Sequence, residues 1–310
     1  MRLRKLLAWA AGGTVATAAV NRALRYTAGD LPPPLSGSRE RTHIRGFEVS
    51  YTEAGDPSDE TLVLLHGIHA AGTSHEFEAV FEPLSSTYHV VAPDLPGFGL
   101  SDRPPISYEA SLYVDVVREF LSAWERPIVV ASSLAGAYAT AAADSMDLGH
   151  LVLVCPTAET VGRSGPRRQL FRLPIVGTGL FNLLVSKPSI RYYLQREGYS
   201  DPAAVDESTV SYFWTTAHQA GARFAPASFV AGFLDPDLDL GSALSDLDME
   251  VTVVWGRQAS RPSLSVGRRL ADRADAPLVV IDPAKLLPHV EQPDAFLDGL
   301  GQVLHGLEDE

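Results

Sequence analysis

Cysteine and lysine are both scarce in this sequence, and each shortage excludes a class of protein. The single cysteine, Cys155, has no partner for an internal disulfide, and a zinc site built from four cysteines is impossible. Arginine supplies nearly all of the 25 basic residues, which face 38 acidic ones and leave a net charge of -13. A chain this acidic repels phosphate backbones, so we expect no nucleic-acid partner. The balance is typical of an acidic protein from a halophilic source or from a GC-rich genome.

Long hydrophobic runs are absent beyond the first 20 residues. A basic N-terminus with Arg2, Arg4 and Lys5 precedes fifteen uncharged residues, 6–20. A full membrane span needs roughly 20 apolar residues, so this run is short for one. Residues 1–30 are therefore interpreted as a signal peptide, an uncleaved anchor or an Ala-rich helix lying on the body. The first two predict export or membrane association through residues 6–20, and the third predicts a cytoplasmic protein.

Short apolar runs alternate with helical patterns after a Pro-rich linker over residues 31–41. Runs of four to five apolar residues without polar alternation are typical of strands covered on both faces, hence of a parallel sheet. A likely strand at 47–52 precedes such runs at 61–65, 89–92, 127–131, 151–154, 251–255 and 278–281, with helical patterns at 74–86, 110–124, 134–144, 264–275 and 294–304. This order predicts an α/β fold. The alternation of apolar runs and helical patterns is interrupted over residues 157–248. This interruption predicts a helical insertion between two parts of the core, 42–156 and 249–310.

The strongest motif is Val129-Val-Ala-Ser-Ser-Leu-Ala-Gly136, where a buried strand runs into an Ala-rich helix. A sharp strand-to-helix turn needs small neighbours, here Ala131 and Ala135, and it lifts its central residue to the positive end of the helix dipole. The segment resembles the nucleophile elbow of the α/β-hydrolase superfamily, with alanines in place of the usual glycines. The resemblance implies that Ser133 is a nucleophile.

Two more segments carry the same resemblance. Leu64-Leu-His-Gly-Ile-His69 is similar to the family segment that supplies an oxyanion-hole amide, which implies that the amides of Ile68 and Leu134 form that hole. Residues 92–104 match the pattern Asp-x-x-Gly-x-Gly-x-Ser-Asp, in which Asp94 and Asp102 are structural. The resemblance implies a mostly parallel central sheet flanked by helices, with a helical lid inserted after the sixth strand.

Two positions depart from the family pattern. The catalytic carboxylate commonly follows Trp-Gly after the seventh strand, but Ala259 stands there. The last motif reads Gly-His, four residues, then Glu-x-Pro; aligned on Glu291 and Pro293, its histidine falls on Leu286. A serine nucleophile needs a base and an orienting carboxylate, so we predict a degenerate triad.

Other side chains are candidates for the missing roles. His289 lies about one helical turn from Leu286, roughly 5 Å along a helix, and is the tentative base; the alternative is a helix-start residue bonded to nearby backbone. Glu159, after the sixth strand, is the tentative acid. Asp282, after the eighth strand, is a second candidate acid, and for both carboxylates the alternative is a solvated surface position.

The expected substrate pocket includes His69, Ser132 and His218. His69 follows the oxyanion position and is interpreted as a base or a polar substrate contact, whereas His218 lies in the insertion and has lid packing as its alternative role. The aromatic and aliphatic insertion predicts an apolar pocket. We expect no cofactor and no metal, and the sequence assigns no oligomeric state.

Three functions are compatible with these residues. The first is a hydrolase of apolar carboxylic esters or related acyl compounds that uses Ser133 with a non-standard base. The second is a catalytically degenerate relative that binds an apolar ligand or partner. The third is non-hydrolytic chemistry at the oxyanion hole. The retention of Ser133 and both oxyanion segments favours the hydrolase.

Overall fold

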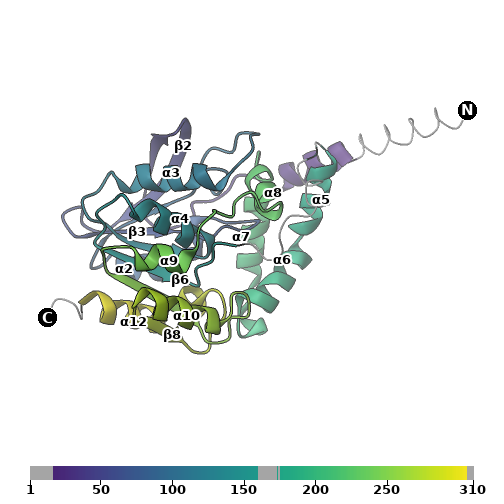
Figure 1. Cartoon of the computed structure of the whole chain (residues 1–310). Helices are drawn as coiled ribbons and strands as arrows, with labels where there is room; N and C mark the ends of the chain where they lie inside the picture. The colour runs from purple at the N-terminus through teal and green to yellow at the C-terminus, as the bar shows by residue number, and fades with distance from the viewer. Residues whose placement is uncertain (1–16, 160–172, 174, 306–310) are drawn as a thin grey trace, which may run out of the picture.

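An eight-stranded sheet forms the centre of the protein (Figure 1). The structure, a computed structural model, describes residues 17–159, 173 and 175–305. The strands are β1 (Ser38–Ile44), β2 (Phe47–Ala54), β3 (Thr61–Leu65), β4 (His89–Pro93), β5 (Ile128–Ser132), β6 (His150–Val154), β7 (Val251–Gly256) and β8 (Leu278–Ile281). Their order is β1-β2-β4-β3-β5-β6-β7-β8. β2 pairs antiparallel with β1 and β4, and all other pairs are parallel.

Helices cover both faces of the sheet. The helical elements outside the lid are η1 (Ser74–Phe77), α2 (Glu78–Leu84), α3 (Ala110–Leu121), α4 (Leu134–Ala143), α10 (Leu264–Ala274), α11 (Pro288–Glu291) and α12 (Pro293–His305). Alternate residues of β5 enter different cores: Val129 packs with α3 and α4, whereas Val130 packs with α2 and α12. This two-residue alternation explains why the buried strands read as continuous apolar runs.

A helical lid lies between β6 and β7. Its elements are α5 (Val176–Leu184), α6 (Lys187–Tyr193), η3 (Leu194–Gly198), η4 (Pro202–Ala204), α7 (Glu207–Ala217), α8 (Phe224–Val230) and α9 (Leu240–Ser245). Figure 1 shows α5, α6, α7 and α8 gathered on one side of the sheet. The predicted α/β fold class, with a mostly parallel sheet and a helical insertion after the sixth strand, is confirmed.

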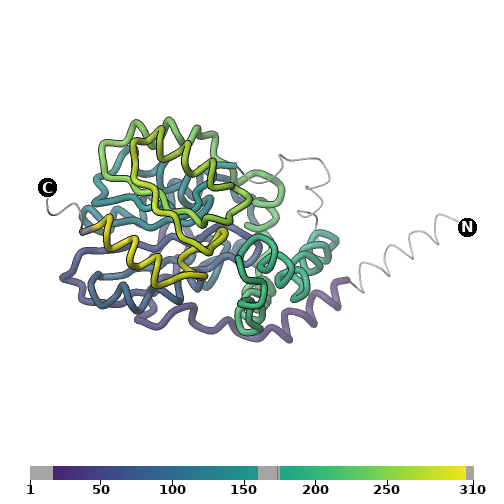
Figure 2. Tube along the Cα trace, turned by 90° about the horizontal axis from the view of Figure 1, so that it is seen from below, coloured from purple at the N-terminus to yellow at the C-terminus, as the bar shows by residue number. Residues whose placement is uncertain are grey.

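The N-terminal stretch, residues 17–35, runs alongside the lid (Figure 2). It begins with a helix over 17–28. Its hydrogen bonds join Asn182 Nδ2 to Asn21 Oδ1 (2.7 Å), Gln219 Nε2 to the Gly29 carbonyl (3.0 Å), Tyr212 Oη to the Pro32 carbonyl (3.4 Å) and His75 Nδ1 to the Pro34 carbonyl (2.9 Å). Residues 1–16, which hold most of the expected anchor or signal, lie outside the described residues. None of the described helices has the length and apolar character that a membrane crossing requires.

The first strand was not expected from the sequence. β1 begins at Ser38, within the stretch interpreted as a linker, and pairs with β2 along its whole length. Its side chains are mostly exposed and include Arg39, Glu40 and Arg41. A charged edge strand protects a sheet against pairing with another chain, and it lacks the apolar run by which the other strands were predicted.

Candidate functional site

Ser133 occupies a strained turn at the carboxyl end of β5. Its backbone has φ 53° and ψ −124°, outside the regions that residues with side chains ordinarily adopt. The turn is held by a 2.9 Å hydrogen bond from the Ser133 amide to the Val154 carbonyl. The Ser133 side chain is partly exposed, and its hydroxyl has no hydrogen-bond partner among the described residues. This geometry presents the hydroxyl at the start of α4.

The amides expected to form the oxyanion hole are free. Neither the Ile68 nor the Leu134 N–H has an acceptor among the residues that the structure describes. Leu134 begins α4, where an amide has no partner within the helix. The loop before Ile68 is fixed by His66, whose Nε2 accepts from the Leu95 amide at 3.0 Å and whose Nδ1 donates to the Gly67 carbonyl at 2.9 Å. Two fixed backbone donors can therefore receive negative charge beside Ser133.

Three side chains converge on Gly67, which has no side chain of its own. A Cβ at Gly67 would lie 3.2 Å from Glu76 Oε2, 3.3 Å from Ser132 Oγ and 3.5 Å from Ser133 Cβ. The Gly67 amide donates a 2.8 Å hydrogen bond to Glu76 Oε2. Sequence reasoning missed Glu76, whose short element η1 carries no family signal and whose partners come from three separate loops.

Glu76 forms a buried pair with His289. Oε1 of Glu76 and Nε2 of His289 are 3.1 Å apart, and the two side chains are only 4% and 0% exposed. The contact lacks hydrogen-bond alignment. Burial raises the pKa of Glu76, but His289, His69 and the Ser132 hydroxyl together outweigh it and lower that pKa to about 2. Glu76 is thus a carboxylate throughout the neutral range.

Apolar side chains occupy the positions where the family resemblance places a triad acid and base. Ala259 belongs to the buried cluster around Trp255 and Cys155, and Leu286 packs against the same cluster. Burial raises the pKa of the Cys155 thiol to about 12, so this cysteine is a packed core residue. Glu159 is exposed on the loop after β6, and Asp282 pairs with Arg257 at 2.7 Å on the surface.

An apolar cavity of about 760 Å³ lies between the lid and the sheet. Its walls include Val185, Ile190, Phe213 and Leu286, and it reaches His69. Burial lowers the pKa of His69 to about 4. His69 Nδ1 accepts a 3.2 Å hydrogen bond from the Ala71 amide, so the neutral ring carries its proton on Nε2. His69 can therefore donate a hydrogen bond to a ligand.

The other two residues expected in the pocket do not line this cavity. Ser132 is buried beneath the elbow and faces Glu76. His218 ends α7, donates from Nδ1 to the Trp214 carbonyl at 2.7 Å and lies against the Trp214 ring. These contacts correspond to lid packing.

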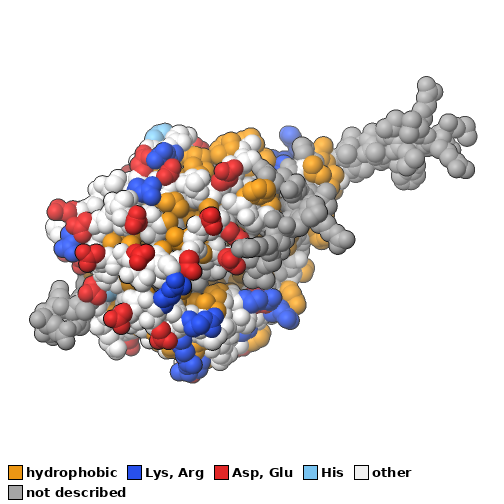
Figure 3. Space-filling model, in the orientation of Figure 1, with side chains coloured by type: hydrophobic (Ala, Val, Ile, Leu, Met, Phe, Trp, Pro, Cys, Tyr) orange, Lys and Arg blue, Asp and Glu red, His pale blue; other side chains and the backbone are white. Residues whose placement is uncertain are grey.

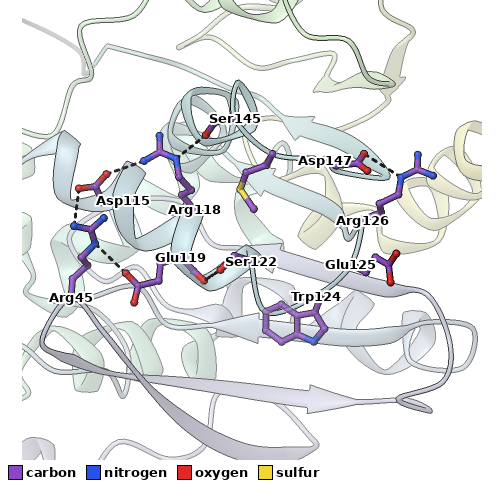
Figure 4. Close-up of a pocket in the computed structure, with 11 residues that line it drawn as sticks. Arg45, Asp115, Arg118, Glu119, Ser122, Trp124, Glu125, Arg126, Ser145 and Asp147 are labelled. Atoms are coloured by element: carbon purple, nitrogen blue, oxygen red, sulfur yellow. Dashed lines mark hydrogen bonds and ion pairs between the residues drawn. The ribbon is translucent and has the colours of Figure 1, made fainter.

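A second cavity, of about 580 Å³, lies at the opposite strand end from Ser133 (Figure 4). Its charged side chains pair with one another: Arg45 with Glu119 (3.1 Å), Arg118 with Asp115 (2.9 Å) and Arg126 with Asp147 (3.2 Å). The described residues also contain no group of three or more side chains placed to hold a metal ion. The elbow with its free amides is therefore the stronger candidate site, together with the apolar cavity. The lining of this cavity does not include Ser133, Ile68 or Leu134 and approaches them through His69.

The sheet order, the elbow and the lid define an α/β-hydrolase type of protein. The chain belongs to the alpha/beta hydrolase family, whose model matches residues 62–298.

Sequence relatives match different shares of the chain. The chain is 23% identical over 290 residues to the uncharacterized hydrolase YugF of Bacillus subtilis, covering 87% of this chain and 92% of YugF. It is 25% identical over 243 residues to the soluble epoxide hydrolase of a Corynebacterium species, covering 71% and 82%. A 33% match to the uncharacterized protein Rv2715 of Mycobacterium tuberculosis spans only 31% of that relative and 36% of this chain.

Solved structures share the fold. A membrane phospholipase A described as a bacterial virulence factor has a TM-score of 0.72 at 22% identity, covering 99% of this chain and 98% of that one. The esterase RhEst1 from Rhodococcus has a TM-score of 0.66 at 21% identity, covering 86% and 98%. The lid is thus part of a shared architecture.

Proposed function

We propose that the protein hydrolyses apolar carboxylic esters or related acyl compounds, with Ser133 as the nucleophile. The observation that carries this proposal is the strained, partly exposed Ser133 beside two unpaired amides. Backbone strain costs free energy, and a serine with a purely structural role would not require it. Two similar proteins named above, an esterase and a soluble epoxide hydrolase, support hydrolysis as the reaction class.

In the proposed reaction, Ser133 Oγ attacks the ester carbonyl carbon and its proton passes to a base. The carbonyl oxygen becomes negatively charged and accepts hydrogen bonds from the Ile68 and Leu134 amides. The C–O bond then breaks, and the alcohol leaves with the proton from the base. Water hydrolyses the acyl ester on Ser133, which releases the acid and restores the hydroxyl.

The proposed base is His289, in place of the histidine that the family pattern puts at Leu286. Its pairing with Glu76 at 3.1 Å supports this role, because a carboxylate stabilises the imidazolium that forms when the ring accepts a proton. Glu76 then takes the role that the sequence suggested for Glu159. His69 is the proposed polar contact for the substrate, through its Nε2 proton.

The cavity supports an apolar substrate. Its walls are mostly aliphatic and aromatic, and a volume of about 760 Å³ is within the range typical of small-molecule sites. The acyl portion would pack against Val185, Ile190 and Phe213 below the lid. The charged side chains of the lining are Arg196, Glu197 and Arg261, and Glu197 pairs with Arg261.

A second candidate function is binding without catalysis. The burial of Ala259 and Leu286 in one apolar cluster favours it, because neither side chain can move a proton. In this alternative the cavity holds an apolar ligand or part of a partner, and Ser133 is not activated.

Membrane association is also proposed, through residues 6–20 and through the exposed apolar surface of the lid. Large hydrophobic side chains are exposed on α5 and α6, with Leu183 at 70% and Tyr192 at 62%. Tyr192 also lines the cavity, so the apolar surface continues into it. Hydrophobic side chains show at the surface beside the lid in Figure 3, whereas acidic ones are spread over the body. Exposed apolar surface of this kind is typical of a site that contacts lipid or protein.

A fluorophosphonate probe tests the catalytic proposal. It should label the purified protein stoichiometrically, because an activated Ser133 forms an O–P bond as fluoride leaves. Labelling should disappear in Ser133→Ala and persist in Ser132→Ala. A folded wild-type protein that stays unlabelled, and that binds an apolar ligand such as an alkyl-chain fluorophore, would identify the binding function instead.

A further inference from the structure

Glu76 joins three loops of the candidate site at one buried carboxylate. Oε2 accepts from the Gly67 amide after β3, Oε1 faces His289 after β8, and the Ser132 hydroxyl at the end of β5 stabilises the charge. The Gly67 amide immediately precedes the Ile68 amide, and Ser132 immediately precedes the nucleophile. The contacts of Glu76 are therefore one residue removed from both Ile68 and Ser133.

From this arrangement we infer that Glu76 is a positioning residue, which holds the Gly67–Ile68 backbone against the elbow so that the amides of Ile68 and Leu134 face one point. This inference rests on the proposed hydrolase function. It adds to the proposed role of Glu76 as the acid partner of His289, because it acts on the oxyanion donors as well as on the base.

The surroundings of Glu76 favour a rigid support. The start of η1 is fixed by Asp94, whose Oδ1 accepts from Ser74 N at 2.8 Å and from Thr73 Oγ1 at 3.0 Å. The imidazole of His289 lies against the rings of Phe77 and Phe296, with centroids 5.1 and 5.7 Å away. A buried carboxylate held in this way has little freedom to move, and its hydrogen bond to Gly67 is strong because the acceptor is charged.

A carboxylate is required by this geometry, whereas a neutral side chain would serve less well. Glu76→Gln keeps an acceptor for the Gly67 amide but places an amide group toward His289 and Ser132. Glu76→Ala leaves the buried Gly67 amide without an acceptor and His289 without its partner. The two variants therefore remove the support in two steps of increasing severity.

The first test is the rate of fluorophosphonate labelling and of p-nitrophenyl octanoate hydrolysis. We expect kcat to fall about 10-fold in Glu76→Gln and about 100-fold in Glu76→Ala, with KM nearly unchanged, because misplacing one oxyanion donor costs about that much. The pH midpoint of the rate reports the pairing of Glu76 with His289, whereas the plateau rate above that midpoint reports the oxyanion donors. A shifted midpoint with an unchanged plateau rate would mean that Glu76 acts only through His289, which overturns the positioning role.

The matched control is Glu53→Gln. Glu53 Oε2 also faces a histidine, His89 Nε2 at 3.6 Å, but this pair lies at the opposite strand end from Ser133. The control should label and hydrolyse at the wild-type rate. Thermal unfolding of all variants identifies any loss of rate that comes from unfolding.

The second test does not need activity. Amide hydrogen exchange over residues 66–69 should become at least about 10-fold faster in Glu76→Ala than in wild type, and stay unchanged in Glu53→Gln. Unchanged exchange and unchanged rates in folded Glu76→Ala would overturn the inference. A wild-type protein without activity, but with faster exchange in Glu76→Ala, would refute the proposed function and leave the structural support in place.

Discussion

Leu286, from the loop after β8, packs against the same apolar cluster that buries Ala259, from the loop after β7. These two loops are joined by a 2.8 Å hydrogen bond from the Gln258 amide to the Ala284 carbonyl. In the sequence alignment the two residues stand where the family resemblance expects an acid and a base, and neither aliphatic side chain can transfer a proton.

This relationship predicts a gain of function when Ala259→Asp/Leu286→His is added to His289→Gln, a variant that lacks the proposed base. If Ser133 and the oxyanion amides are already in place, adding an imidazole and its carboxylate should raise ester hydrolysis by about 100-fold or more. Rates with p-nitrophenyl octanoate measure it, and the gain must vanish when Ser133→Ala is added. Ala259→Asp alone should unfold more easily, by roughly 2–4 kcal/mol, because its buried charge has no partner. A folded combined variant without any gain would count against a preformed oxyanion hole.

Backbone strain at Ser133 predicts a difference between two inactive variants. With φ at 53°, alanine keeps the strain of the turn, whereas glycine adopts such angles at little cost. Ser133→Gly should therefore be more stable than Ser133→Ala by about 1 kcal/mol. Urea denaturation of both proteins measures the difference. Equal stabilities would mean that the turn stores no strain.

Burial of His69 predicts a loss of stability in acid. Its pKa falls from 6.5 to about 4 in the folded protein, so the unfolded chain binds more protons between these values. The neutral ring makes its full contribution to the free energy of unfolding above pH 6.5. This contribution, roughly 2–3 kcal/mol, is lost as the pH falls toward 4. The free energy of unfolding, measured by urea from pH 7 to 4, should fall less steeply in His69→Gln than in wild type. Parallel curves would contradict a buried, neutral His69.

The contribution of Glu76 to the free energy of unfolding changes in a different pH range from that of His69. Its pKa of about 2 is below the ordinary 4.5, so its contribution is lost as the pH falls from 4.5 toward 2. The two effects therefore fall in different parts of one titration. His69→Gln should alter mainly the upper part of the curve, with a smaller change below pH 4.5, because His69 also lowers the pKa of Glu76.

The proposed membrane surface predicts binding to lipid vesicles. The full chain should sediment with vesicles of phosphatidylcholine and phosphatidylglycerol, because exposed apolar side chains on α5 and α6 add to the apolar residues 6–20. The double variant Leu183→Ser/Tyr192→Ser should bind vesicles several-fold more weakly, because it removes apolar surface that would be buried in the lipid. Both side chains are more than half exposed, so their replacement should not disturb the core. Removing residues 1–16 should weaken it further. Equal sedimentation of the chain with and without these changes would contradict the proposed surface.

The sequence predicts the parts of this protein whose signals are local. Each buried strand has its own apolar run, and Ser133, Ile68 and Leu134 each lie in a short motif that forms at one turn. The pair Glu76–His289 could not be predicted in this way, because its members come from distant segments and meet only after η1 and α11 are packed against the sheet. Likewise β1, with an exposed and charged pattern, becomes a strand through its pairing with β2.

The N-terminal stretch has a mechanical consequence for the cavity. The lid is connected to the sheet by its own two chain ends and by direct bonds such as Lys285 Nζ to the Arg196 carbonyl (2.8 Å). The bonds from Asn182, Gln219 and Tyr212 join it to the N-terminal stretch as well. The lid therefore cannot move away from the sheet as one rigid unit without breaking these hydrogen bonds. Exchange of the cavity's contents is therefore expected to depend on the movement of single wall side chains such as Leu184 and Tyr192, which are 41% and 62% exposed.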